Sequence, residues 1–418
     1  MSKQYSNKRV RVWDNGLYLE LARRLAQDFA QVEYYVPWES QFPKSNITEI
    51  GSGIEEITKI LDFWDNLDSV DLFVFPDIYS SGTQILLESL GKRVWGSRRG
   101  EDFEIERVKS KKYLTSLGIN IGEYDTITGI SNLRAFLKDK QDVYVKVSRS
   151  RGDTETFHCE NYSLVEPKLT ELEWTLGAKK ELYEFLVERA IEGVEISYDG
   201  YCVDGEFAYP ALLGIEIKGK CYVGVVKSRS EMPSQVVEQN DKLSEPLRLL
   251  KYRNFLSPES RMTPSQTLIL TDPCCRMPST GEAYPEIFSN ISDIIWKGAE
   301  GELVEPECKF KFVAELDIFS PFAGKNPALI QFPQELRSNL KFRNLTVINK
   351  EHYVIPQGDE GQTLCGVVAL GDSLSEATER CKEYAKQVKG YQVECPFESF
   401  DEAAREIEKL ESFGVKFI

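Results

Sequence analysis

Short apolar runs separated by amphipathic stretches dominate the first hundred residues. Four apolar runs predict strands, at residues 10–13, 32–36, 72–75 and 94–95. Helical periodicity between them predicts helices at residues 17–29, 54–67 and 82–90. Strands that alternate with helices are typical of a small parallel sheet with helices on its faces. The pattern therefore predicts an N-terminal α/β lobe over residues 1–103.

The next two hundred residues are richer in strands. A helix is predicted at 104–117, and Gly118 follows it as a C-cap. Predicted strands then follow at residues 143–147, 184–188, 195–203, 206–208 and 221–226. Asp204-Gly205 lies between two alternating runs and predicts a hairpin turn. A helix-rich stretch at 241–252 leads to strand-like sequence at 262–272, and we assign residues 104–295 to a second region.

The pattern changes again in the last part of the chain, residues 296–418. Predicted strands lie at residues 312–318, 328–332, 345–348 and 364–369. Two amphipathic helices, at 374–387 and 401–413, close the chain. These elements predict a third, strand-rich lobe.

One predicted strand end has unusual chemistry, Leu270-Thr271-Asp272-Pro273-Cys274-Cys275-Arg276. Side chains alternate along a strand, so Asp272, Cys274 and Arg276 are predicted to point to one face. A carboxylate suits Mg²⁺, and an arginine beside it suits anionic oxygen. This combination suits phosphate chemistry, although a solvated strand end is the better explanation of the segment when it is taken alone.

Composition and charge exclude several classes of function. The chain has 418 residues and a formal net charge of -16, which argues against a nucleic-acid or anionic-membrane surface. No apolar signal segment or membrane span is present in the sequence, and nine cysteines without a C-x-x-C pair indicate reduced thiols. These features predict a cytoplasmic protein. The chain has only two histidines, His158 and His352, which excludes a multi-histidine metal centre, and both are interpreted as structural.

Further candidate residues occur in a fixed order upstream of that strand end. Arg107 opens the predicted helix, and Lys146 lies in the apolar strand VYVKV ahead of the polar loop around Gly152. Glu188 and Glu195 lie in the segment LVERAIEGVE, and Glu259 follows in FLSPESRM. The first strand is followed by Asp14-Asn15-Gly16 instead of a G-x-G-x-x-G loop, which argues against NAD or FAD.

This order resembles the ATP-grasp superfamily, and within it the phosphoribosylamine–glycine ligase type, over about residues 104–290. The resemblance implies ATP and Mg²⁺ as cofactors. It implies nucleotide contacts by Arg107, Lys146, Gly152, Glu188, Arg189, Ala190, Glu195 and Lys227. The adenine would meet the backbone of residues 187–190, and Glu195 would meet the ribose. The resemblance also implies metal ligands at Glu259, Asp272 and Cys274, and a catalytic Arg276 on the transferred phosphate.

The C-terminal region carries a second resemblance. The strand, Gly-Asp turn and helix of residues 364–377, LCGVVALGDSLSEA, are similar to the C-terminal lobe of phosphoribosylamine–glycine ligases. The expected fold class is therefore α/β, an ATP-grasp fold with an N-terminal parallel α/β lobe and a strand-rich C-terminal lobe.

The resemblance implies an ATP-dependent carboxylate–amine ligase that forms an acyl phosphate from small-molecule substrates. Two alternatives stay open. The family usually has Glu-x-Asn where this chain has Asp272-x-Cys274, and a thiol is a poor Mg²⁺ ligand. A nucleotide-binding protein without ligase activity, acting as a sensor or assembly subunit, is therefore the first alternative. Phosphotransfer to a non-carboxylate acceptor is the second. A homodimer is the default oligomer.

Overall fold

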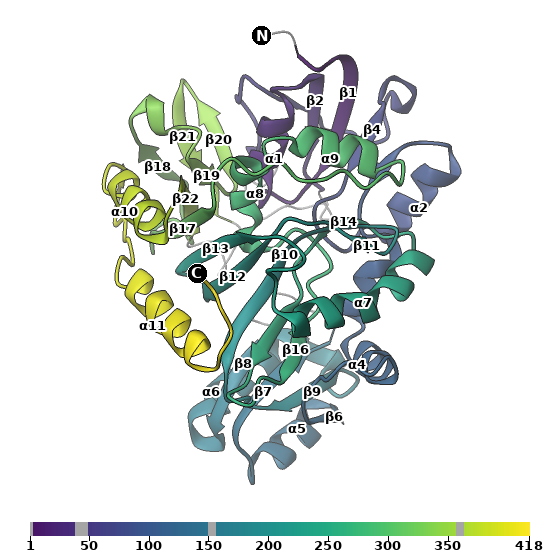
Figure 1. Ribbon diagram of the computed structural model, residues 1–418, viewed down its shortest axis with the longest axis vertical. Helices are drawn as coiled ribbons and strands as arrows, with labels where there is room; N and C mark the ends of the chain where they lie inside the picture. Colours follow the sequence, from purple (N-terminus) through teal and green to yellow (C-terminus); the bar gives the residue numbers. More distant parts are fainter. Residues whose placement is uncertain (1–2, 38–48, 149–155, 357–362) are drawn as a thin grey trace.

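The computed structural model describes residues 3–37, 49–148, 156–356 and 363–418, which form four β-sheets with helices around them (Figure 1). The N-terminal sheet is parallel, in the order β3-β2-β1-β4-β5. Its strands are β1 (Tyr5–Trp13), β2 (Phe29–Tyr35), β3 (Thr58–Lys59), β4 (Leu72–Val74) and β5 (Val94–Trp95). Helices α1 (Leu19–Leu25) and α2 (Ser81–Ser89) connect strands of this sheet. The predicted parallel α/β lobe is confirmed.

The prediction of a helix at residues 54–67 is wrong. Thr58–Lys59 instead forms the edge strand β3, paired with β2, and only the 3₁₀ turn η2 (Leu67–Ser69) follows. The Asp62 carboxylate accepts a hydrogen bond from the backbone N–H of Trp64. Such a local side-chain bond competes with helix formation, and the strand pairing decides the outcome.

A small antiparallel sheet follows, in the order β6-β9-β7-β8, and we call it the lid sheet. Its strands are β6 (Tyr124–Thr128), β7 (Gln141–Val147), β8 (Thr156–Asn161) and β9 (Glu184–Arg189). Helices α5 (Ile130–Leu137) and α6 (Tyr162–Leu176) pack on it, and the turn η5 (Gly177–Lys179) leads back to β9. Leu133, Val145 and Leu169 are fully buried in its separate apolar core.

The largest sheet has ten strands and combines distant parts of the chain. It runs β16-β15-β10-β12-β13-β17-β22-β19, with β11 and β14 also paired to β10. Its strands are β10 (Val194–Val203), β11 (Glu206–Phe207), β12 (Ala211–Ile217), β13 (Cys221–Lys227), β14 (Arg253–Leu256), β15 (Glu259–Met262), β16 (Leu268–Asp272), β17 (Phe312–Phe319), β19 (Leu340–Phe342) and β22 (Thr363–Gly371). The predicted hairpin turn is confirmed: Asp204 and Gly205, both with positive φ, connect β10 and β11.

The remaining strands form a fourth sheet, in the order β20-β21-β18-β23. They are β18 (Ala328–Gln331), β20 (Leu345–Ile348), β21 (Glu351–Val354) and β23 (Lys389–Gly390). Other helices are α7 (Ser234–Leu249), α8 (Tyr284–Ile287), α9 (Ile291–Gly298), α10 (Leu374–Ala385) and α11 (Ser399–Ser412), with 3₁₀ turns η3 (Arg98–Glu101), η6 (Ser279–Ala283) and η7 (Gln334–Leu336). Helix α10 contacts β17 and β22, and α11 contacts β12 and β13 (Figure 1).

The helix predicted at 104–117 is divided into α3 (Asp102–Ile105) and α4 (Arg107–Ser116), which meet at Glu106. Gly118 follows with positive φ, as predicted for a C-cap. Within the described ranges, no helix combines the length and apolar character that a membrane span requires.

Candidate active site

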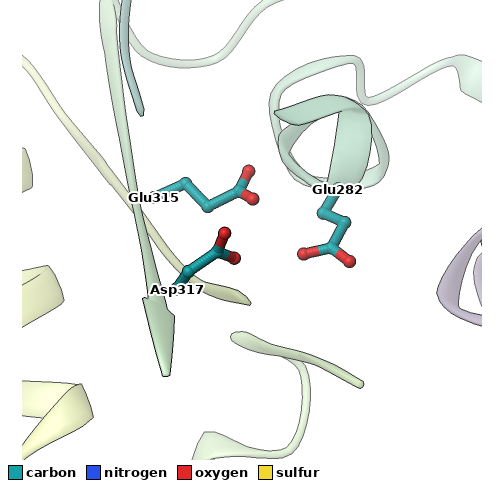
Figure 2. A group of neighbouring side chains, drawn as sticks. All are labelled: Glu282, Glu315 and Asp317. Carbon is teal, nitrogen blue, oxygen red and sulfur yellow. The ribbon is translucent and has the colours of Figure 1, made fainter. Parts of the chain in front are cut away.

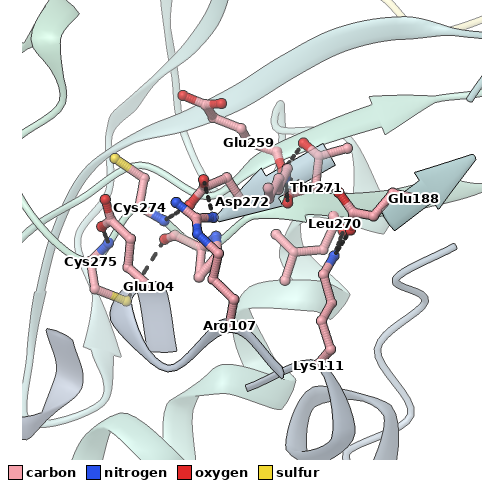
Figure 3. A network of polar contacts seen from close by, with 12 residues as sticks. Glu104, Arg107, Lys111, Glu188, Glu259, Leu270, Thr271, Asp272, Cys274 and Cys275 are labelled. Atoms are coloured by element: carbon pink, nitrogen blue, oxygen red, sulfur yellow. Dashed lines mark hydrogen bonds and ion pairs between the residues drawn. The ribbon is translucent and has the colours of Figure 1, made fainter. Parts of the chain in front are cut away.

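Two lysines and a glutamate connect the lid sheet to α4 and β16. Figure 3 shows Lys111 of α4 beside Glu188 and Leu270. Glu188 on β9 pairs with Lys111 of α4 at 2.5 Å and with Lys146 of β7 at 3.0 Å. Lys146 Nζ also donates to the Thr271 carbonyl on β16, at 2.8 Å. Burial alone would raise the pKa of Glu188, but Lys146 and Lys111 outweigh it and lower the pKa. Glu188 is therefore ionised, and its contacts with the two lysines hold the lid sheet beside β16.

Two carboxylates occupy paired positions on β15 and β16, next to a register shift between Glu259 and Ser260. Glu259 is opposite Asp272 in the antiparallel register, so both side chains project from the same face of the sheet. Arg107, the first residue of α4, donates to Asp272 Oδ2 at 3.3 Å, and the Cys274 N–H donates to Oδ1 at 3.0 Å. Burial opposes ionisation, yet Arg107 and Lys146 hold the pKa of Asp272 well below its usual range.

Glu259 lies in a second group, around Lys218 at the tip of the β12–β13 hairpin. The Lys218 ammonium contacts Glu259 at 2.8 Å, Glu216 at 2.9 Å and Glu195 at 3.1 Å. Burial is the main factor that raises the pKa of Glu259 to about 8, with Lys218 acting against it and Glu195 adding to it. Three carboxylates with one half-exposed lysine leave this end of the site acidic.

Arg276 is held on the other side of Asp272. Its Nε donates to Glu104 Oε1 at 2.9 Å, and its Nη1 contacts Tyr18 Oη at 3.3 Å. Burial favours the neutral guanidinium, but Cys274, Glu104 and Tyr18 outweigh it and raise the pKa of Arg276, so the side chain is charged.

The prediction that Asp272, Cys274 and Arg276 continue one alternating strand is wrong. Strand β16 ends at Asp272, and Cys274 has a φ of 35°, which breaks the alternation. Pro273 has no N–H to donate to a ladder, and the Asp272 carboxylate caps the turn through the Cys274 N–H. The Cys274 side chain is buried.

The fold itself resembles that of known enzymes. Phosphoribosylamine–glycine ligase from Thermotoga maritima superimposes with a TM-score of 0.67 at 16% identity, over 92% of this chain and 98% of that one. The biotin carboxylase domain of 2-oxoglutarate carboxylase from Hydrogenobacter thermophilus, in complex with MgADP, gives a TM-score of 0.67 at 12% identity, over 97% and 98%. The chain has the ATP-grasp fold.

A third ATP-grasp structure extends the comparison. L-amino acid ligase from Bacillus licheniformis gives a TM-score of 0.63 at 12% identity, over 92% of this chain and 99% of that one. No family model matches the sequence, and no curated protein matches it. At these identities the three comparisons establish only a shared fold. The chemistry must therefore be argued from the residues of this chain.

The ATP-grasp fold does not bring every predicted residue to the site. Lys227 is the last residue of β13, and the charges of Glu231 and Lys311 act on it. The Arg189 side chain is largely exposed and pairs with Glu123, while the Ala190 N–H donates to the Asp142 carbonyl. Gly152 and its loop lie outside the described residues.

Three further residues that line the ATP-grasp site were not predicted. Lys111 is four residues after Arg107, so helical spacing places both on one face of α4, and this signal was available in the sequence. Lys218 and Glu216 have no comparable local signal. Their position depends on β12 lying beside β10, a pairing that only the folded sheet defines.

The carboxylates present fit a magnesium ion. Glu259 and Asp272 offer hard oxygen atoms from one face, and Mg²⁺ commonly binds through one or two carboxylates while keeping several waters. The Cys274 backbone contacts Asp272, so this residue supports a ligand and offers no oxygen ligand from its side chain. Mg²⁺ bound there would neutralise the phosphate charge of a nucleotide.

Proposed function

We propose that the protein is an ATP-dependent ligase that joins a small carboxylate to an amine, or to a related nucleophile, through an acyl phosphate. One observation carries the proposal: the cations Arg107, Lys111 and Lys146 converge beside the Glu259–Asp272 pair. A site that binds the phosphates of a nucleotide together with a metal ion needs cationic side chains for the phosphates and carboxylates for the metal. The fold is also that of two ligases named above, which supports the same class of reaction.

The nucleotide would use the predicted residues in defined roles. Arg107 and Lys146 would contact its phosphates, and Glu195 its ribose. Glu259 and Asp272 would hold Mg²⁺, and Arg276 would stabilise the transferred phosphate. The lid sheet would exclude water.

The proposed reaction has two steps. A carboxylate oxygen attacks the γ-phosphorus of ATP, the bond to ADP breaks, and an acyl phosphate forms. The nitrogen lone pair of the amine then attacks the acyl carbon, the C–O bond to phosphate breaks, and inorganic phosphate leaves with that electron pair. The nitrogen gives up a proton, and an amide remains. Positioning and charge neutralisation supply most of the rate enhancement in such a mechanism.

Nucleotide binding is tested by a thermal-shift titration with ATP and Mg²⁺ on the parent and on Lys146→Ala and Glu195→Ala. A ligand at about 100 times its Kd stabilises the folded state by about 2.7 kcal/mol, so the parent should melt a few degrees higher. Both variants should lose most of the shift, and Lys112→Ala, an exposed lysine of α4, should keep it. A folded parent that ATP does not stabilise would refute the site.

Ligase activity is tested next, with hydroxylamine as a small nucleophile that captures acyl phosphates as hydroxamates. The parent is incubated with ATP, Mg²⁺ and pools of small carboxylic acids. Hydroxamate formation with phosphate release supports the ligase. ATP binding without either product would favour the nucleotide-binding protein without ligase activity, and a stable phosphorylated product without hydroxamate would favour phosphotransfer to another acceptor.

A further inference from the structure

Helix α2 presents an apolar face to solvent. Its exposed positions, with the C-cap residue, recur at helical spacing, and we call this face the α2 stripe: Gly82, Ile85, Leu86, Ser89 and Leu90. The exposed fraction is 44% for Ile85, 46% for Leu86 and 56% for Leu90. No side chain of the α2 stripe carries a charge. Single exposed leucines are normal on a protein surface, whereas a contiguous apolar face indicates an interaction site.

The other described helices differ from α2 in this respect. Helix α6 has two exposed large apolar side chains, Leu164 and Trp174, but they lie ten residues apart, and the exposed acid Glu171 lies between them. Helix α7 has one such side chain, that of Leu249. Among the helices that the structure describes, three exposed aliphatic side chains therefore share one face only on α2.

The opposite side of α2 is anchored to the N-terminal lobe, so the α2 stripe is a preformed surface. Gln84 and Leu87 are fully buried. The Gln84 amide donates to Ser80 Oγ at 2.9 Å, and its Oε1 accepts a hydrogen bond from the Arg98 N–H at 2.7 Å. The Glu101 carboxylate accepts a hydrogen bond from the Ser80 N–H at 3.2 Å. A surface that is already ordered loses little conformational entropy on binding, and this favours association.

The α2 stripe is complementary to itself under a two-fold axis. Gly82 and Ser89 are about two helical turns apart, so they lie in line along α2, with Ile85 on one side of the line and Leu86 on the other. Two antiparallel copies of α2 place Gly82 opposite the partner's Ser89, and Ile85 opposite the partner's Leu86. A Cβ at Gly82 would meet nothing within 4 Å in the single chain, so this position is open to a second helix. The small residues allow a close approach, and the large ones pack beside them.

We infer that two copies of the chain associate through their α2 stripes as an antiparallel, two-fold symmetric helix pair. Three aliphatic side chains, each about half exposed, provide roughly 300 Å² of apolar surface per copy and roughly 600 Å² per pair. An apolar share near 60% then gives about 1,000 Å² of total interface, the size of weak and transient complexes. Each copy has a net charge of -16, so two copies repel each other, and salt that screens this repulsion strengthens the pair.

The test is sedimentation velocity of the full chain over a range of concentrations, without nucleotide. At about 0.15 M salt we expect a monomer–dimer equilibrium with a Kd of roughly 10–100 µM, and at about 0.5 M salt the Kd should fall severalfold. Leu86→Glu, which places a charge in each stripe, and Gly82→Trp, which fills the open position, should each raise the Kd at least about tenfold. Leu249→Glu, at the exposed leucine of α7, should leave the Kd unchanged.

Three outcomes would overturn the inference. The parent stays monomeric at about 200 µM, above the expected Kd. A dimer persists in either α2 variant, so that the contact lies on another face. Added salt weakens the dimer, so that ion pairs hold it instead of an apolar contact. Both substitutions are at exposed positions, so the variants should fold, which circular dichroism checks, and Ile85→Glu replaces Leu86→Glu if that variant does not fold.

Discussion

Asp14, at the end of β1, is a buried carboxylate without a cationic partner within hydrogen-bonding distance among the described residues. One of its oxygens accepts hydrogen bonds from the N–H groups of Gly16 and Tyr18 and from the Tyr34 hydroxyl. Burial outweighs these bonds and raises the pKa of Asp14 to about 6, above the ordinary 3.8. The ionised form is therefore less stable in the folded protein than in the unfolded chain.

This shift predicts a pH dependence of stability. The contribution of Asp14 to the free energy of unfolding is fully present below pH 4 and is lost as the pH rises through about 6. A pKa shift of this size corresponds to a loss of about 3 kcal/mol in all. The free energy of unfolding of the parent, measured by guanidinium denaturation, should therefore fall relative to that of Asp14→Asn between pH 4 and pH 7. Asp62→Asn, at an exposed acid, should follow the parent. A parent that gains stability relative to Asp14→Asn over this range would contradict the burial argument.

Single residues of the site were predictable where their chemistry has a local signal. Arg107, Lys146 and Asp272 were identified because a helix start, a lysine inside an apolar strand and an acidic strand end are each visible in a few letters. The structure brings these three together. Lys227 was selected by the same reasoning, and the fold places it at the far end of β13 from the Lys218 turn. A short motif defines which residue type is present, and the sheet register decides where the side chain lies.

At the scale of elements, the β12–β13 hairpin controls the charge of the candidate metal site. Its turn contains Gly219 with a φ of 63°, and this turn directs Lys218 toward Glu195, Glu216 and Glu259. An ammonium group there competes with a divalent cation for the Glu259 carboxylate. The lysine side chain is 55% exposed, so a metal ion can displace it into solvent.

Replacing Lys218 should therefore strengthen metal binding. Lys218→Met removes the competing charge, and we expect the affinity for Mn²⁺, used in place of Mg²⁺, to rise about tenfold, or about 1.4 kcal/mol. Mn²⁺ titration followed by electron paramagnetic resonance measures this directly. Lys220→Met, which removes a lysine from the other end of the same turn, should change the affinity little. Unchanged or weaker Mn²⁺ binding by Lys218→Met would show that the lysine does not compete with the metal.

Elements were predicted best where apolar alternation is strong, as in β10 and β17. The break between α3 and α4 was missed because its cause is not local. Glu104, just before the break, accepts hydrogen bonds from the Cys275 N–H and from Arg276, and Arg107, just after it, pairs with Asp272. Residues about 165 positions away therefore fix this helix start, and helical periodicity alone contains no information about them.

At the scale of the whole molecule, the ten-stranded sheet connects the region of residues 104–295 to the C-terminal region. Strand β17 pairs with β13 on one side and with β22 on the other. The boundary predicted near residue 295 therefore lies between strands of one sheet. Nothing in the sequence indicates this, because a pairing between segments about ninety residues apart leaves no local pattern. Likewise, Glu282 of η6, Glu315 of β17 (Figure 2) and Arg343, which follows β19, come together only in the folded protein.

This topology predicts that the chain cannot be divided at that boundary without loss of folding. A fragment of residues 1–300 would expose the edge of β13 and the Val223 and Val225 side chains, which are almost completely buried in the intact protein. An unpaired, apolar strand edge favours aggregation. We expect fragments 1–300 and 301–418 to be insoluble or to unfold without cooperativity when each is expressed alone. Expressed together, with a tag on the second only, they should purify as a complex. A fragment 1–300 that unfolds cooperatively near the melting temperature of the full chain would show that the sheet is completed without β17.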